Sequence, residues 1–459
     1  MTELRPNSHI ERLAHSPLGA VLARPWFDTV ALHYLAWRYI PLSRAWAAAT
    51  AAEGSLERFL EGVTIGGAAR ATYRRLVVLL GRVERLRRAA EAAEERWREA
   101  AFGPARIDGE ALAEAETARR RAAHALRATR RRFTLLPRRH LLPPVRYAVP
   151  RPAEFEARYG DVLATPERAY AAPDPAPEVV ESGRCPGPHG TQHWIRFASP
   201  SATMADTVHA RVLEPAGVAD PPTLIFGHGL WVEGEQWRSM PDPVAPLLRR
   251  GVRVVHVESP WHGRRAPLGE YGGERFFATA PQGVFELFSA QARETAAIVA
   301  WARRTSAGRV AVGGISLGAQ VAQLVAVHAR HWPAEMRPDA LLLITSCDRI
   351  DEVALGGSLC RAFGLDRALQ KAGWSAQELA RWRPLLDPLG TPAMAPGNVV
   401  AVLGSADSVT PYALGKAMLE RWGVPRENMF IRRQGHFSAV IGALRDTSHL
   451  DRLHAILSR

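Results

Sequence analysis

Cysteine is scarce in this sequence of 459 residues: Cys185, Cys347 and Cys360 lie far apart and form no C-x-x-C pair. Their spacing excludes a disulfide framework and a cysteine-based zinc site. The sequence also lacks an uninterrupted apolar run of about 18 residues, the length needed to cross a bilayer. Its first residues contain no apolar segment like that of a secretory signal. We therefore expect a cytoplasmic protein without a transmembrane span.

Lysine is rarer still, and arginine carries almost all of the basic charge. Residues 1–150 hold 26 arginines against 15 acidic residues, a net charge of +11, whereas residues 151–459 hold 33 basic against 31 acidic residues. Because zinc-finger, RRM and KH patterns are absent, we expect no nucleic acid partner. Two interpretations remain for the basic segment. It is either a solvated surface in an arginine-rich chain or a peripheral contact with an anionic membrane.

The first 135 residues are predicted to be an all-α extension rich in arginine and alanine. Between 31 and 52 the chain is apolar but interrupted by charged residues, which suits a docked or interfacial helix. A coiled-coil-like antiparallel hairpin is expected over residues 70–133, because Gly and Pro near 103–109 separate two stripes of helical period. The stripes are Leu76, Leu79, Val83, Leu86, Ala90, Ala93 and Trp97, then Ala111, Ala115, Ala118, Ala122, Ala125 and Thr129.

Prolines dominate residues 136–185, which we interpret as an extended connection. Residues 186–459 then alternate short apolar runs with segments of helix length, the pattern of a mostly parallel sheet with helices on both faces. We expect the first two of eight strands to be antiparallel. The predicted strands are Gln192–Ala198, Val208–Leu213, Thr223–Gly227, Val252–Val257, Val310–Ile315, Ala340–Thr345, Val399–Leu403 and Met429–Arg432.

Gly314-Ile315-Ser316-Leu317-Gly318 is a G-x-S-x-G motif between a predicted strand and a predicted helix. In this context the serine occupies a strained turn and is exposed as a nucleophile, and the glycines avoid collisions with neighbouring backbone. An incidental serine in a glycine-rich turn is the alternative. A serine hydroxyl needs a base to activate it, so the interpretation depends on a histidine elsewhere in the chain.

Asp407 follows the predicted strand 399–403, and His436 follows the last strand. The order Ser316, Asp407, His436 along the chain is the order of a catalytic triad in this kind of sheet. His436 would then accept the Ser316 proton, and Asp407 would orient the imidazole. Taken separately, Asp407 could be a helix cap and His436 a structural residue. Asp348 and Asp387 are rival candidates for the acid.

Acyl transfer also needs N–H donors for the oxyanion. The strand Thr223–Gly227 ends in His228-Gly229, and such a loop can present a backbone N–H beside the nucleophile. We predict the N–H groups of Leu230 and Leu317 as the pair, with His228 ordering the loop.

Residues from about 190 to the end resemble the α/β-hydrolase superfamily. The resemblance rests on the His228-Gly229 loop, the Gly314–Gly318 turn, Asp407 and His436. It implies an α/β-hydrolase fold with a helical lid, which we place at residues 347–397 because this insert is apolar. The 180 residues before it match no recognised part of the superfamily.

A second loop, residues 259–265, resembles the Pro-x-His-Gly-Arg loops of some α/β hydrolases. It follows the predicted strand Val252–Val257 and is therefore expected at the carboxyl edge of the sheet, where ligands bind. Arg264 and Arg265 could bind an anionic part of a substrate there; the alternative is an ion pair within the chain. The full set of predicted substrate-binding residues is Trp231, Trp261, His262, Arg264 and Arg265.

These observations favour a serine hydrolase that cleaves a carboxylic ester through an acyl-enzyme intermediate. Its substrate would be a small-molecule or lipid ester with an apolar acyl part. The same triad would serve an acyltransferase, and a non-catalytic scaffold with a membrane-contacting extension is the alternative from another class. The chemistry requires no metal and no organic cofactor, and the oligomeric state is left open.

Overall fold

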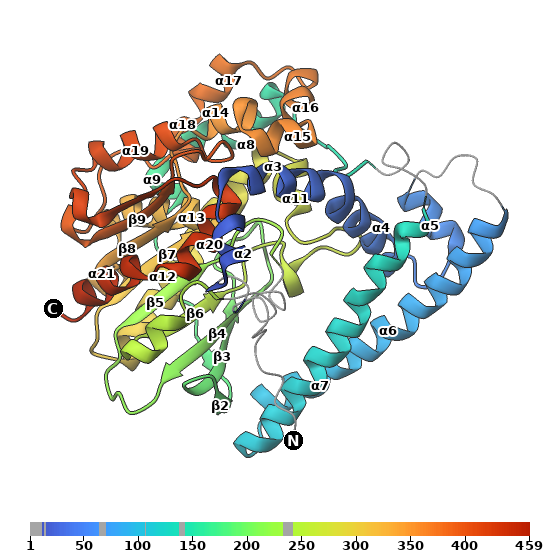
Figure 1. Ribbon diagram of the computed structural model, residues 1–459, viewed down its shortest axis with the longest axis horizontal. Coiled ribbons are helices and arrows are strands. Elements are labelled where there is room, and N and C mark those ends of the chain that lie inside the picture. The colour runs from blue at the N-terminus through green and yellow to red at the C-terminus, as the bar shows by residue number, and fades with distance from the viewer. Residues whose placement is uncertain (1–11, 13–14, 64–69, 106, 137–142, 233–241) are drawn as a thin grey trace.

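The structure is a computed structural model that describes residues 12, 15–63, 70–105, 107–136, 143–232 and 242–459. Parts of the predicted extension and connection, at 1–11, 13–14, 64–69, 106 and 137–142, lie outside these residues. A ten-stranded sheet forms the centre of the C-terminal part (Figure 1). Its order is β1-β3-β4-β6-β5-β7-β8-β9-β10, with β2 paired to β3.

All eight predicted strands are present, and the predicted arrangement is confirmed. The pairs β3–β4 and β4–β6 are antiparallel, and the strands from β6 through β10 pair in parallel. Two short strands, β1 (Val180–Glu181) and β2 (Cys185–Gly187), extend the antiparallel edge. The others are β3 (Gly190–Ala198), β4 (Thr207–Pro215), β5 (Thr223–Gly227), β6 (Arg253–Val257), β7 (Val310–Ile315), β8 (Ala340–Ile344), β9 (Val399–Gly404) and β10 (Met429–Arg432).

Helices cover both faces of the sheet because its central strands are apolar on both sides. On β5, Ile225 packs toward α12 (Gln282–Thr305) and α13 (Leu317–His328). Leu224 and Phe226 point to the opposite face and pack with η4 (Ala245–Arg250) and α21 (Ser448–Leu457). The sheet is therefore the middle of three layers.

The N-terminal region is helical, as predicted. It contains α2 (Pro17–Leu22), α3 (Pro25–Tyr34), η1 (Leu35–Tyr39), α4 (Ile40–Ala51), α5 (Leu56–Gly62), α6 (Arg70–Phe102), α7 (Gly109–Ala128) and η2 (Thr129–Leu135). Helices α6 and α7 lie side by side as the expected hairpin (Figure 1). The N–H of Ala111 donates to the Asp108 carboxylate at 2.7 Å, which caps the start of α7.

Along α7 the predicted second stripe is displaced by one residue, whereas its last member, Thr129, is buried as predicted. Helix α7 buries Leu112, Glu116 and Arg119, whereas Ala118 and Ala125 are exposed. Arg119 pairs with Glu116 at 2.8 Å and lies over a tryptophan ring of α6. These ion pairs and the ring contact allow charged side chains to occupy the buried face, which a count of apolar residues does not detect.

The extension packs against the sheet domain at several points. Trp97 of α6 contacts Trp194 of β3 edge-to-face, with 5.3 Å between the ring centroids. Arg44 of α4 forms a buried ion pair with Glu274 at 3.1 Å. Truncating either partner would leave a buried charge unpaired, so this contact fixes the position of α4.

The connection differs from the predicted extended segment, because it contains α8 (Pro152–Leu163) and α9 (Pro166–Ala169). Both helices begin with proline, which is favourable at the first position of a helix. Phe155 of α8 is buried and contacts the rings of Trp374 and Trp382. The proline-rich segment is thus part of the packed core.

Five short helices lie between β8 and β9, within the insert predicted as a lid. They are α14 (Ile350–Gly356), α15 (Ser358–Phe363), α16 (Leu365–Lys371), α17 (Ala376–Arg381) and α18 (Arg383–Leu386). The remaining α-helices of the described residues are α11 (Glu274–Ala278), α19 (Tyr412–Arg421) and α20 (His436–Arg445). Within the described ranges, no helix combines the length and apolar character required to span a bilayer.

Candidate active site

Ser316 lies in the tight turn between β7 and α13. Its backbone has φ of 53° and ψ of −114°, a conformation that L-residues rarely adopt. A Cβ on Gly314 would lie 2.2 Å from the carbonyl carbon of Gly318, and a Cβ on Gly318 would lie 2.3 Å from Gly227. The two glycines therefore allow the turn to form with the Ser316 side chain projecting from it.

The structure brings Ser316, His436 and Asp407 together. The Nε2 atom of His436 lies 2.9 Å from the Ser316 Oγ, and the His436 Nδ1 lies 2.8 Å from the Asp407 Oδ2. Asp407 and His436 are both buried. The distances and order are those of a proton relay in which the imidazole accepts the hydroxyl proton.

Asp407 is held by its own loop. Its Oδ1 accepts hydrogen bonds from the N–H groups of Val409 and Thr410, both at 2.9 Å, and its Oδ2 accepts one from the Thr410 hydroxyl at 2.8 Å. Both rival acids are engaged elsewhere: Asp348 pairs with Arg421, and Asp387 pairs with Arg383. Asp407 is therefore the carboxylate positioned to orient the His436 ring.

A residue from the extension also reaches this site, although no sequence motif singles it out. Asp28 of α3 accepts hydrogen bonds from the N–H of Phe437 at 2.6 Å and from the N–H of Ser438 at 3.3 Å. These groups belong to the first turn of α20, which begins at His436. The Asp28 carboxylate thus caps the helix that carries the histidine. The sequence signal was only an acidic residue in the first turn of another helix.

The loop after β5 packs against the Ser316 turn. A Cβ on Gly229 would lie 3.7 Å from the Ser316 Cβ, and the N–H of Gly318 donates to the His228 carbonyl at 2.9 Å. The Nε2 of His228 accepts a hydrogen bond from the N–H of Ser259 at 3.2 Å. His228 consequently joins the loop after β5 to the loop after β6.

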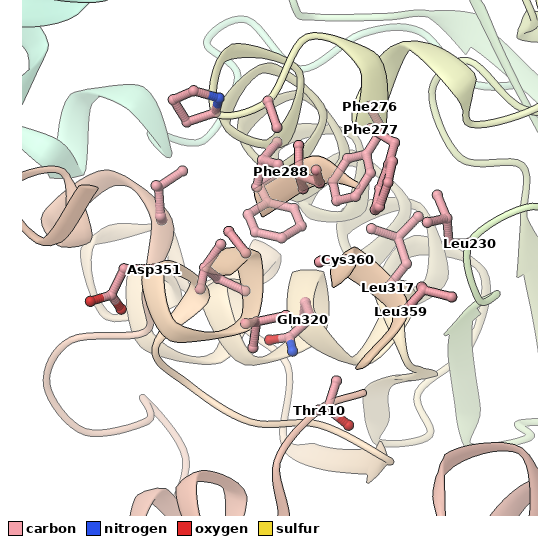
Figure 2. A pocket seen from close by; sticks show the side chains of 18 of the residues that line it. Leu230, Phe276, Phe277, Phe288, Leu317, Gln320, Asp351, Leu359, Cys360 and Thr410 are labelled. Carbon is pink, nitrogen blue, oxygen red and sulfur yellow. The ribbon is translucent and has the colours of Figure 1, made fainter. Parts of the chain in front are cut away.

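An apolar cavity of about 100 Å³ opens beside Ser316. Leu230 and Leu317, whose N–H groups are the predicted oxyanion donors, both line it (Figure 2). Phe276, Phe277 and Phe288 form an aromatic wall above them (Figure 2). The helices of the insert supply much of the remaining lining: Ile350, Asp351, Val353, Ala354, Leu359, Cys360, Leu365, Leu369, Leu379 and Leu386.

Comparison with models of known protein families agrees with this fold. Residues 224–446 match the model of the alpha/beta hydrolase family. The C-terminal domain has the α/β-hydrolase fold, and we call it the hydrolase domain. Comparison with curated protein sequences gives no match.

Solved structures resemble this hydrolase domain at low sequence identity. An acylaminoacyl peptidase from Pyrococcus horikoshii has 13% identity and a TM-score of 0.39, and the match covers 56% of this chain and 39% of that chain. An S-formylglutathione hydrolase from Agrobacterium tumefaciens has 16% identity and a TM-score of 0.40, with coverage of 60% and 98%. A puromycin-hydrolysing peptidase from Mycobacterium tuberculosis has 12% identity and a TM-score of 0.40, with coverage of 61% and 46%. The chain therefore spans about two fifths of the acylaminoacyl peptidase.

The hydrolase domain places three predicted substrate-binding residues behind the cavity wall. Trp231 and Trp261 are largely buried, and the ring of Trp231 packs against Phe363, with 4.8 Å between centroids. His262 is fully buried, and its Nε2 accepts a hydrogen bond from the N–H of Trp231 at 3.3 Å. Among the described residues, none of these three lines the cavity beside Ser316. Their contacts support the loop that carries Leu230.

Arg264 and Arg265 do not line the cavity beside Ser316, and both form ion pairs within the chain. The buried Arg265 guanidinium pairs with Asp206 at 2.8 Å and with Glu294 at 2.6 Å. Arg264 pairs with Glu94 of the hairpin at 2.8 Å. Both arginines line a different cavity, of about 520 Å³, between the hairpin and the hydrolase domain. The alternative, ion pairs within the chain, is what the structure contains.

No group of three or more His, Cys, Asp or Glu side chains in the described part of the chain is arranged to hold a metal ion.

The buried loop residues His228 and His262 should make the free energy of unfolding of the hydrolase domain fall in acid. Burial lowers the pKa of His228 to about 4 and that of His262 to about 3. Between pH 6.5 and 4 the unfolded histidines bind protons and the folded ones do not, so stability falls as the pH falls. Each contributes a slope of about 1.4 kcal/mol per pH unit. Urea denaturation at pH 7, 6 and 5 would measure this change in the free energy of unfolding with pH.

A matched pair of variants isolates this effect. His262→Gln should reduce the pH dependence of the unfolding free energy by the share of one proton, whereas His124→Gln, at an exposed position of α7, should not change it. Equal slopes for His262→Gln and the wild type would contradict the prediction.

Proposed function

We propose that this protein is a serine hydrolase that cleaves carboxylic esters with an apolar acyl group. The observation that carries the proposal is the alignment of Ser316, His436 and Asp407, with the nucleophile in a strained turn at the mouth of an apolar cavity. A serine placed for packing alone would not need this backbone strain.

Each residue has a defined role in the proposed reaction. The Ser316 Oγ attacks the ester carbonyl carbon while its proton moves to the Nε2 of His436. The negative charge that develops on the carbonyl oxygen is stabilised by the N–H groups of Leu230 and Leu317. Leu317 is the first residue of α13, where a backbone N–H has no partner within its helix.

The intermediate then collapses. The ester C–O bond breaks, the alcohol leaves with the proton from His436, and the acyl group stays on Ser316. Water attacks this acyl-enzyme, gives its proton to His436, and the carboxylic acid is released as Ser316 recovers its proton. Asp407 stays ionised throughout and stabilises the imidazolium form of His436.

The lining of the cavity favours an apolar acyl group over a polar acyl group. Aliphatic and aromatic side chains form nearly all of its lining, with Gln320, Asp351 and Thr410 as the polar exceptions besides Ser316. A volume of about 100 Å³ suits a short to medium acyl chain. Since each buried methylene contributes about 0.8 kcal/mol, kcat/KM should rise by about fourfold per methylene until the cavity is filled.

A fluorophosphonate probe tests the proposed nucleophile. The wild-type protein should be labelled, and peptide mass spectrometry should place the adduct on Ser316. With p-nitrophenyl esters, hexanoate should be cleaved faster than acetate, and addition of an acceptor alcohol should leave the free acid as the main product. Absence of labelling would support the scaffold alternative, a new ester would support acyl transfer, and fastest cleavage of acetate would contradict the apolar acyl site.

A further inference from the structure

The first helices of the extension expose an unusual number of large apolar side chains. In the described part of the chain fourteen such side chains are exposed, and six of them lie between Leu18 and Trp37. Their exposed fractions run from 48% to 63%. We call this surface the α2–η1 face and define it by Leu18, Val21, Trp26, Val30, Tyr34 and Trp37. Apolar surface gathered in this way marks a site of contact.

The face is one side of a helix whose other side is already packed. Trp26, Val30, Tyr34 and Trp37 recur at spacings of four, four and three residues along α3 and η1, so they project in one direction. On the inner side Ala36 is buried, and Leu35 and Tyr39 pack against the main core. The inner side therefore packs against the core while the outer side is exposed.

The charged residues around the α2–η1 face indicate which kind of partner it binds. Arg24 and Arg38 flank the apolar residues and are exposed. Between His15 and Tyr39 the only acidic residue is Asp28, and its carboxylate binds the first turn of α20 on the inner side. The outer face thus presents tryptophan, tyrosine, aliphatic groups and arginine without an exposed carboxylate. This combination is typical of helices that lie in the interface of an anionic bilayer.

A second copy of the chain fits the face less well. A twofold interface brings the same surface of each copy together, so the arginines would meet arginines with no acidic partner. The acidic headgroups of a bilayer, in contrast, neutralise Arg24 and Arg38 while the aromatic rings enter the boundary with the acyl chains.

We propose that the α2–η1 face docks on an anionic membrane surface. Helix α3 contacts α15, which supplies Leu359 and Cys360 to the cavity beside Ser316. Figure 1 shows α3 and α15 lying beside each other. Docking through this face holds α15, and with it part of the cavity lining, close to the lipid surface. The inference concerns binding and is independent of the proposed hydrolytic activity.

Co-sedimentation with vesicles tests the inference on the full chain carrying Ser316→Ala, so that hydrolysis cannot alter the lipid. We expect binding to vesicles of phosphatidylcholine with 30% phosphatidylglycerol and at least tenfold weaker binding to pure phosphatidylcholine. Trp26→Ser with Trp37→Ser should weaken binding at least tenfold. Arg24→Glu with Arg38→Glu should remove the preference for anionic lipid and leaves every apolar residue of the face in place.

The matched control is Val77→Ser with Val78→Ser, which removes two exposed apolar side chains of α6 outside the face. This pair should bind as the parent does. Unchanged binding by the tryptophan pair, equal loss in the valine pair, or equal binding to both vesicle types would each overturn the inference. Self-association that the tryptophan pair abolishes would also overturn it, because the face would then bind a second copy. Fluorophosphonate labelling of the wild-type chain reports on Ser316 separately.

Discussion

Replacement of Asp407 by asparagine is expected to lower kcat by about 10⁴-fold while the protein remains folded. The amide oxygen of the new side chain can still accept from the N–H groups of Val409 and Thr410, so the loop keeps its conformation. The amide nitrogen would then face the His436 Nδ1 and donate to it. The ring would hold its proton on Nε2 and could no longer accept the proton of Ser316. Steady-state kinetics with a soluble p-nitrophenyl ester would measure the loss.

The rival acids supply matched controls for this variant. Asp348→Asn and Asp387→Asn each replace a buried carboxylate by its amide, but these residues pair with Arg421 and Arg383 rather than with His436. Either change should alter kcat by less than about tenfold, whatever it does to the melting temperature. If Asp348→Asn abolished activity and Asp407→Asn did not, the assignment of the acid would be wrong.

Replacement of Asp28 by alanine is expected to lower kcat by about 10²-fold with little change in KM. The N–H groups of Phe437 and Ser438 would lose their acceptor, and the start of α20 would lose its cap. His436 is the first residue of that helix, so its ring would leave the position that places Nε2 2.9 Å from Ser316. Misplacement of a reacting group by about 1 Å is enough for such a loss. Asp28 is in this sense a positioning residue.

Two variants separate positioning from general stability. Asp28→Asn keeps one acceptor oxygen and should recover part of the kcat that Asp28→Ala loses. Arg445→Ala removes a contact between the extension and the other end of α20, where the guanidinium donates to the Ser16 carbonyl at 2.8 Å. It should lower the melting temperature without the same loss of kcat. Normal kcat in Asp28→Ala would refute the role assigned to Asp28.

The features that local patterns encode were predictable from the sequence. A strand that is buried on both faces leaves a continuous apolar run, and the residues after it must lie at the carboxyl edge of the sheet. Ser316 and Asp407 each follow such a strand, and His436 follows the partly exposed edge strand β10, so their order and positions in the sequence predict that all three lie at one edge of the sheet. The hairpin was predictable for a similar reason, because its two arms are separated by Gly and Pro.

The features that depend on distant pairs were not predictable. Nothing beside Arg264 in the sequence indicates that its partner is Glu94, and Asp28 is separated from Phe437 by 409 residues. The buried face of α7 differs from the predicted stripe because Arg119 is stabilised inside the hairpin by an ion pair and by contact with a tryptophan ring. Composition and periodicity describe one element at a time, whereas each of these contacts joins two.

The contact between Asp28 and the start of α20 has a consequence for the newly made protein. Helix α3 precedes α20 along the chain, so the ribosome synthesises α3 first. Helix α3 can meet its partner only after Phe437 and Ser438 have emerged, and the histidine beside them is among the last parts of the site to appear. The nascent chain therefore carries Ser316 before it carries His436, and Asp28 can hold the start of α20 only after both segments have been made.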